Sequence, residues 1–259
     1  GAKTTIVVAA SAPTLYYYCS VHSGMGGQAN TNSTAGASNF DGSIQATVRA
    51  NPTAGFSVVT YTGDNAASGT IAHGLNAAPK FVIIKSRNVA DFWPVYHHSL
   101  GTNHLKLNDT GASGVDLFGS EPTSSVFSVG TGNEMNGNYD YLALCFSPVE
   151  GYSAMGSYTG NGSADGPFVY TGFRPAFLLA KRTNGTAFWA IVDSVRDSDN
   201  VMSAQIYPNS SQAEGNSAVV DFLSNGFKLR STSNEFNTSS APYVYYAAAE
   251  HPFKTARAR

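Results

Sequence analysis

Charged residues are scarce in this chain. Asp, Glu, Lys and Arg make up 12% of its 259 residues, about half the share of an ordinary soluble domain, and Ser, Thr, Asn and Gly take their place. The formal net charge is −2. A nucleic-acid partner is not expected, because a polyanion needs a basic stripe on the protein. Solvated disorder is excluded too, since it combines high net charge with few apolar side chains, and hydrophobic residues make up 42% here.

Cysteine and long apolar runs are also rare. The chain has two cysteines. Cys145 lies in an apolar segment and is interpreted as a small core side chain, whereas a disulfide between Cys19 and Cys145 stays open. No apolar stretch is long enough to span a bilayer. The chain starts at Gly1 inside an apparent strand, without Met, which indicates a piece of a longer polypeptide; Gly1 as a native terminus stays open.

Motifs of known reactions are missing as well. The sequence has no nucleophile elbow, no phosphate-cradling glycine loop and no helix-borne histidine pair. Its acidic residues are scattered without a close pair of the kind used in glycoside cleavage, although such pairs can be distant in sequence. His97 and His98 are adjacent in an expected strand, so their side chains would point to opposite faces and a structural or surface role is favoured. We therefore predict a protein that is not an enzyme.

What the chain does contain is an internal repeat of about 100 residues, the size of a small domain rather than of a solenoid unit. The two copies open at Gly55 and Gly151, and each continues through a Tyr-Thr-Gly motif. A proline, a lysine and a Phe-Trp pair then follow at identical spacings: Pro79, Lys85, Phe92 and Trp93 correspond to Pro175, Lys181, Phe188 and Trp189. The closing segments 141–148 and 245–252 are also similar. The repeated residues are packing types, so a structural frame was duplicated rather than a reaction centre.

Short apolar or alternating segments, separated by Gly, Asn and Pro, indicate strands, and no helical periodicity reaches three turns. The fold class predicted is all-β, with two tandem related β-sandwich (jelly-roll-like) domains. The expected boundaries are an N-terminal strand pair in 1–30, a linker in 31–51, and sandwich repeats in 52–149 and 150–259.

The two Phe-Trp pairs are predicted to anchor the repeats, together with Pro79 and Pro175. Recurrence at one position favours core packing of Phe92, Trp93, Phe188 and Trp189 over a sugar-stacking platform. Adjacent strand residues face opposite ways, however, so one ring of each pair can still reach the surface. At least one of Phe188 and Trp189 is expected to be deeply buried.

Cys19, His22 and Met25 follow each other at three-residue steps in a tight loop after a strand. This spacing resembles the copper-ligand loop of cupredoxins, in which a thiolate and an imidazole hold the metal and a thioether is axial. By that resemblance the three side chains would be copper ligands. The family pattern also needs a histidine upstream, and none precedes Cys19. We therefore expect a metal-free remnant and no cofactor, unless another part of the polypeptide or a neighbouring subunit supplies the histidine.

The repeat as a whole resembles a tandem β module of bacteriophage structural and tail-fibre-like proteins, notably of marine phages. The resemblance covers residues 14–259 and rests on the phrases Gly156–Gly162, Asp221–Arg230 and Glu250–Lys254. It implies a component of the virion, an extracellular particle. A non-enzymatic tail or fibre protein that positions or makes host-surface contacts is favoured. The alternatives are a capsid decoration protein, such as a cement or head-fibre protein, and a virion-associated polysaccharide hydrolase.

The partners implied are other virion proteins, further copies of the same chain, and a glycan or protein of the host surface. Many weak contacts from Ser, Thr, Asn, Gly and Tyr gain strength when they are multiplied on one particle. Sparse charge also lowers the cost of burying large subunit interfaces. We therefore expect a homo-oligomer, whose symmetry, receptor and host the sequence does not specify.

Overall fold

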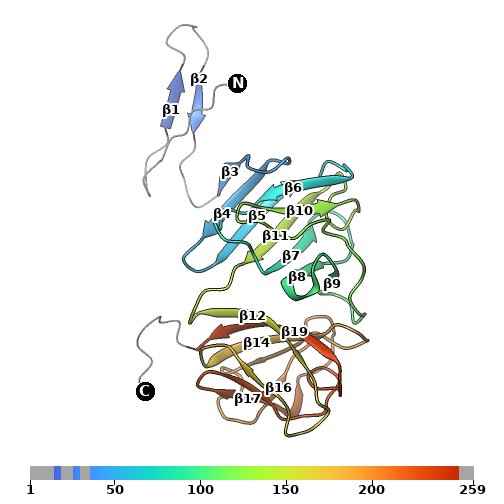
Figure 1. Ribbon diagram of the computed structural model, residues 1–259. Helices are drawn as coiled ribbons and strands as arrows, with labels where there is room; N and C mark the ends of the chain where they lie inside the picture. The colour runs from blue at the N-terminus through green and yellow to red at the C-terminus, as the bar shows by residue number, and fades with distance from the viewer. Residues whose placement is uncertain (1–14, 19–25, 30–35, 251–259) are drawn as a thin grey trace.

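The computed structural model describes residues 15–18, 26–29 and 36–250 (Figure 1). Within these ranges the regular structure is almost entirely strand, and the one helical element is a short 3-10 turn, η1 (His98–Leu100). No helix of the described residues is long and apolar enough to cross a membrane. The prediction of an all-β, sandwich-type fold is confirmed.

The described chain begins with a hairpin of β1 (Leu15–Tyr18) and β2 (Gly26–Ala29), paired antiparallel. This hairpin lies within the segment 1–30 for which a strand pair is predicted. Cys19, His22 and Met25, the three residues of the cupredoxin-like pattern, lie outside the described residues. The copper-remnant hypothesis therefore stays a prediction.

The first sandwich packs a seven-stranded antiparallel sheet against a two-stranded one. The large sheet has the order β3 (Ala37–Asn39), β4 (Ala46–Asn51), β5 (Phe56–Thr62), β11 (Asp140–Phe146), β7 (Phe81–Ser86), β8 (Pro94–His97), β9 (His104–Lys106), and the small sheet pairs β6 (Ser68–Ala72) with β10 (Val126–Gly130). Inward side chains of both sheets, such as Val59, Ile71, Val82 and Phe127, form its core.

The predicted linker 31–51 is wrong from residue 37 onward, because β3 and β4 lie in this stretch and join the large sheet through β5. Ala46 and Val48 alternate with exposed or half-buried neighbours and point into the first core. A strand whose inward apolar side chains are Ala46, Val48 and the partly buried Ala50 has little signal of its own, embedded as it is in Gly, Ser and Asn. Its place in the sheet depends on pairing with β5.

The second sandwich consists of two facing four-stranded antiparallel sheets. One has the order β12 (Ser153–Thr159), β19 (Pro242–Ala249), β14 (Pro175–Arg182), β15 (Ala190–Asp193), and the other has the order β13 (Phe168–Tyr170), β18 (Gly226–Leu229), β17 (Gly215–Leu223), β16 (Met202–Gln205). Leu178, Val220, Phe222 and Phe227 are fully buried between them.

The repeat is visible in the strand order. The series β5-β11-β7-β8 of the first sandwich corresponds to β12-β19-β14-β15 of the second. Tyr61 stacks on Tyr141 with 5.1 Å between ring centroids, and Tyr158 stacks on Tyr243 at 5.0 Å. Tyr141 therefore corresponds to Tyr243, not to residue 245 as the sequence comparison predicts. A two-residue slip in a strand keeps every side chain on its face, so the pattern alone does not reveal the error.

A second repeated element holds the ends of these strands together. Tyr61 donates its hydroxyl to the main-chain oxygen of Met135 at 2.7 Å, and Tyr158 does the same to Phe236 at 2.9 Å. Both acceptors lie in the motif Asn-Glu-Met/Phe-Asn, at 133–136 and 234–237. The last residue of each motif, Asn136 or Asn237, is fully buried.

The glycine of each Tyr-Thr-Gly motif lies against this element. A Cβ atom at Gly63 would collide with the main-chain oxygen of Gly137, and one at Gly160 would collide with that of Thr238. The main chain thus approaches so closely that only glycine fits. The repeated Gly is explained by packing between the end of β5 or β12 and the turn before the last strand of the same sandwich.

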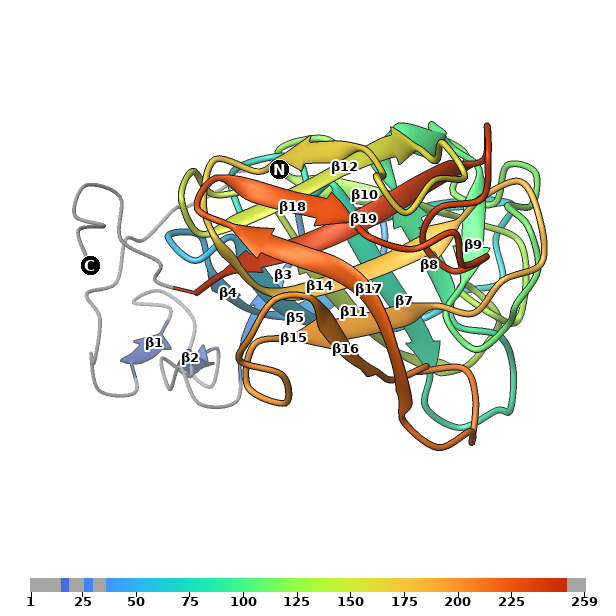
Figure 2. The ribbon, with the colours of Figure 1, turned by 90° about the horizontal axis from the view of Figure 1, so that it is seen from below.

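The two sandwiches meet through the equivalent outer face of each (Figures 1 and 2). In Figure 2 the strands β14 and β19 lie over β7 and β11, and Figure 1 shows them stacked. Phe81 and Val95 of the first sandwich pack with Leu179 and Val244 of the second. Tyr246 lies in the middle of this interface, with its ring centroid 5.9 Å from that of Phe81. The two units therefore form one packed body.

Candidate functional site

The six residues predicted as repeat anchors fall at equivalent places but do not play equivalent parts. Pro79 and Pro175 are both buried, just before β7 and at the start of β14. Each Phe-Trp pair directly precedes an equivalent strand, β8 or β15. The duplication thus places the pairs alike, and their surroundings differ.

Trp189 is a core side chain of the interface between the sandwiches. It is 1% exposed and packs with Leu105 of the first sandwich. Its indole nitrogen donates to the main-chain oxygen of Lys106 at 2.8 Å, so the ring bridges the two units. Phe188 is half-buried and lies against Tyr207, with 5.1 Å between ring centroids.

Phe92 and Trp93 are exposed, by 42% and 37%. The expectation that this pair anchors a core is wrong, because among the described residues no second sandwich covers the two rings. Each ring instead lies beside an ammonium group. The Nζ of Lys106 is 3.6 Å from the centroid of the Phe92 ring, and that of Lys85 is 5.8 Å from Trp93. Such cation–π contacts hold a cation against an aromatic face.

We call this surface the aromatic ledge; it consists of Lys85, Phe92, Trp93, Lys106 and Asn108. Asn108 fixes its geometry by accepting a hydrogen bond from the Trp93 main-chain N–H at 2.9 Å. Asn209 does the same for Trp189 at 3.1 Å. Sequence comparison missed this pair of asparagines, although both occur in a repeated Asn-x-Thr/Ser-x-Ala-x-Gly pattern that begins at 108 and at 209.

Lys181 differs from its counterpart Lys85 in burial. It is fully buried, and its Nζ donates to the main-chain oxygens of Thr110 at 3.1 Å and Arg182 at 2.8 Å. Burial lowers the pKa of Lys181 to about 8, against the opposing effect of the Asp109 charge. Lys181 therefore connects the second sandwich to the loop of the first that contains Thr110. Lys85 is only half-buried, and its Nζ donates to the nearby main-chain oxygen of Val89 at 3.1 Å.

His97 and His98 both point toward the second sandwich, contrary to the expectation of opposite faces. Their Nε2 atoms lie 3.2 Å from the main-chain oxygens of Tyr245 and Met155, and their rings stack. Strand alternation does not apply, because β8 ends at His97 and η1 begins at His98. Burial lowers the pKa of His97 to about 3, although its hydrogen bond to Tyr245 opposes the shift. A neutral His97 is therefore part of the interface.

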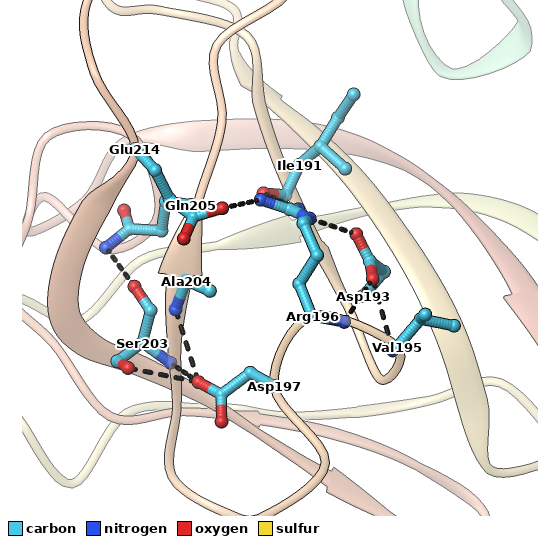
Figure 3. Close-up of polar contacts among 9 residues, drawn as sticks. All are labelled: Ile191, Asp193, Val195, Arg196, Asp197, Ser203, Ala204, Gln205 and Glu214. Atoms are coloured by element: carbon cyan, nitrogen blue, oxygen red, sulfur yellow. Dashed lines mark hydrogen bonds and ion pairs between the residues drawn. The ribbon is translucent and has the colours of Figure 1, made fainter.

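One group of charged side chains lies around the loop after β15 (Figure 3). Arg196 pairs with Asp193 at 2.6 Å and with Glu214 at 2.7 Å. Burial opposes ionisation of Asp193, but hydrogen bonds from Arg196 outweigh it and lower the pKa of the carboxyl. Asp197 accepts hydrogen bonds from Ser203, which lower its pKa as well. Carboxyl groups held ionised in this way are poor general acids, so this cluster orders a loop.

Among the residues that the structure describes, no group of three or more His, Cys, Asp and Glu side chains could hold a metal ion. Cys145 is fully buried in the first core, and burial raises the pKa of its thiol to about 12. It is a packing residue rather than a ligand or nucleophile.

Fold and surface together define a tandem β-sandwich protein whose two units share one interface and whose first unit exposes an aromatic ledge. The chain belongs to the family described as Domain of unknown function (DUF7483), whose model matches residues 29–252. This match spans both sandwiches, so the family unit is the pair and not the single repeat. No curated protein and no solved structure matches the chain.

Proposed function

We propose that the chain is a non-enzymatic structural protein of a bacteriophage virion, a component of the tail or fibre that positions or makes contacts with the host surface. The observation that carries the proposal is the nature of what is repeated. Both units reproduce a stacked tyrosine pair, a buried asparagine and a glycine at a close main-chain approach. A duplicated scaffold of this kind suits a part that bears load and spaces other parts.

The surface supports the same role. Ser, Thr, Asn and Gly are abundant and charge is sparse, which allows many modest contacts with other virion proteins and with a host glycan or protein. The aromatic ledge adds two exposed rings beside two ammonium groups. Such a surface is suited to recognition by contact rather than to turnover.

The decisive experiment is to locate the chain in intact particles by electron microscopy, with an antibody against the exposed loop 161–165. Labelling of the tail or fibre is the expected result. Labelling spread over the head with capsid symmetry would favour the alternative of a decoration protein. Absence of the chain from purified particles would contradict both virion roles.

The alternative of a virion-associated polysaccharide hydrolase is tested separately. Purified protein is incubated with host-surface polysaccharide while reducing ends are measured, and no turnover is expected. Asp193, Asp197 and Glu214 are the carboxylates to substitute, because they lie together around the loop after β15 (Figure 3). Turnover that one of these substitutions abolishes would overturn the non-enzymatic assignment.

A further inference from the structure

One loop of the first sandwich, residues 107–113, crosses to the second sandwich and binds there. The main-chain oxygen of Thr110 accepts a hydrogen bond from Lys181 Nζ at 3.1 Å. The main-chain oxygen of Asp109 accepts another from Asn209 Nδ2 at 3.1 Å. The loop is therefore recognised through its main chain, by side chains that surround the buried Trp189.

The receiving side chains have equivalents on the first sandwich, and these form the aromatic ledge. Lys85 corresponds to Lys181, Trp93 to Trp189 and Asn108 to Asn209. On the ledge these groups are more open than in the second sandwich: Lys85 is half-buried, Asn108 is exposed and Trp93 is 37% exposed. The ledge thus reproduces the receiving site without the loop that fills it.

The loop itself also recurs, as residues 208–214. Equivalent antiparallel pairs close the two loops, His104 with Gly114 and Gln205 with Gly215. Residues 211–214 are exposed, and the ion pair of Glu214 with Arg196 at 2.7 Å holds the loop to its own sandwich. The described chain therefore presents one receiving ledge and one docking loop that do not engage each other.

The strands before the two loops differ in their sheet partners. β9, which precedes the first loop, extends the sheet that faces the other sandwich. β16, which precedes the second loop, pairs with β17 in the outer sheet, although Ile206 directly after it still pairs with Ile191 of β15. Asn209 at the start of the second loop contacts Asp109, but residues 211–214 stay exposed, so a copy of them on another chain is free to approach the ledge.

We propose that the aromatic ledge is a self-association site that binds loop 208–214 of a second copy of this chain. The main-chain oxygens of Ser210 and Ser211 take the places of Asp109 and Thr110. They accept hydrogen bonds from the side chains of Asn108 and Lys85, and the loop covers Trp93. The contact joins the second sandwich of one copy to the first sandwich of the next. This inference does not depend on the proposed virion role.

Sedimentation of the full chain over a range of concentrations is the first test. The wild-type chain is expected to associate in a concentration-dependent way and the Trp93→Ala variant to remain monomeric. Phe168→Ala, which removes an exposed ring from the second sandwich, is the matched control and should associate like the wild type. A wild-type chain that is monomeric up to its solubility limit would overturn the proposal, as would unchanged association of Trp93→Ala.

Disulfide trapping identifies the contact itself. The main-chain N–H of Ala187 donates to Thr110 at 3.0 Å, and the equivalents of these two residues are Asp91 and Ser211. Chains with Asp91→Cys and differently tagged chains with Ser211→Cys, both in a Cys19→Ser background, are mixed under mild oxidation. A cross-link between the two tags is expected. The proposal fails if this cross-link is no more abundant than with exposed Val195→Cys in place of Asp91→Cys. A further test uses one chain that carries both Asp91→Cys and Ser211→Cys. A disulfide that forms only within single chains of this variant would also overturn the proposal.

Discussion

At the scale of residues, Trp93 and Trp189 show how one sequence position acquires two physical roles. Both precede an equivalent strand and both are fixed by an asparagine. Trp189 is enclosed because the first sandwich lies over it, and Trp93 is not. Burial is thus decided by what faces the side chain in the tertiary structure.

The two tryptophans should differ in their effect on stability. Trp189→Ala is expected to lower the free energy of unfolding by about 3–5 kcal/mol, as a large-to-small change in a packed core. Trp93→Ala should change it by less than about 1 kcal/mol in the monomer, since little packing is lost at the surface. Urea denaturation at low protein concentration measures both values. Equal losses would show that the interface does not stabilise the fold through Trp189.

His97 should make stability depend on pH. Its folded pKa is about 3, whereas an unfolded histidine titrates near 6.5. Between these values the unfolded chain binds the proton and the folded chain does not, so this contribution is complete above about pH 6.5 and is lost as pH falls toward 3.

Wild type should therefore lose about 2 kcal/mol more stability than His97→Gln when pH falls from about 7 to about 5. The glutamine amide can still donate to the Tyr245 oxygen but does not titrate. The comparison removes the contributions of His73 and His98, whose pKa values burial also lowers. Parallel pH profiles of urea midpoints in the two proteins would contradict the assignment.

At the scale of elements, the repeated turn with a buried asparagine holds neighbouring strands and loops of each sandwich together. Asn237 Nδ2 donates to the Asn161 side chain at 3.0 Å and to the main-chain oxygens of Ser163 at 2.7 Å and Ser231 at 2.8 Å. Asn136 donates to Asp64 at 3.1 Å in the first sandwich. A buried side chain with this many partners specifies the turn that it holds.

Removing either asparagine should be costly. Asn136→Ala and Asn237→Ala are each expected to destabilise the chain by about 3 kcal/mol, because buried main-chain groups lose their partners. The exposed Asn103 provides the control, and Asn103→Ala should change stability by less than about 0.5 kcal/mol. Thermal or urea unfolding measures all three. A cost for only one of the two buried asparagines would mean that the elements are alike in shape but not in energy.

The sequence predicts most strands of the two sandwiches, but not β3 and β4, the register of the last strand, or the turn with the buried asparagine. Alternation and turn residues predict strands well where one face is apolar, as in Phe56–Thr62. They say little about β3 and β4, whose polar residues become strand only by pairing. Registers separated by two residues look alike, so sequence comparison pairs Tyr141 with Tyr245 instead of Tyr243. The pattern Asn-Glu-Met/Phe-Asn, by contrast, is a signal that a search by apolar period overlooks.

The site was less predictable than the fold. The repeat predicts that Trp93 and Trp189 lie at equivalent positions, and they do. It does not predict which of the two faces water, because that depends on the loop 107–113 and on the sandwich opposite. Contacts between units are set by pairs of residues distant in sequence, such as Trp189 and Lys106.

At the scale of the whole molecule, the two sandwiches should unfold as one unit. Their interface contains an apolar cluster and hydrogen bonds between the units, including the buried one of His97 with the Tyr245 oxygen. Scanning calorimetry of the wild type is expected to give a single transition whose calorimetric and van't Hoff enthalpies agree.

Tyr246→Ala should uncouple them. The ring of Tyr246 lies 5.3 Å from that of Phe146 and 6.0 Å from that of Phe177, so its loss opens the centre of the interface. We expect the single transition to broaden or divide in two. Tyr170→Ala, which removes an exposed ring from the outer sheet, should leave it unchanged. Two transitions already present in the wild type would refute the coupling.

The meeting of equivalent faces has a consequence for how such a chain arose. A lone sandwich with the Phe81 and Ile83 face, or with its Phe177 and Leu179 counterpart, would leave an apolar surface in water and would pair with its own twin about a two-fold axis. Gene duplication converts that encounter into an intramolecular one, which no longer weakens on dilution. Two sandwiches joined in one chain are free to diverge in sequence. The surroundings of Trp189 then serve to hold the two sandwiches together, whereas the equivalent surface around Trp93 is exposed and available for another contact.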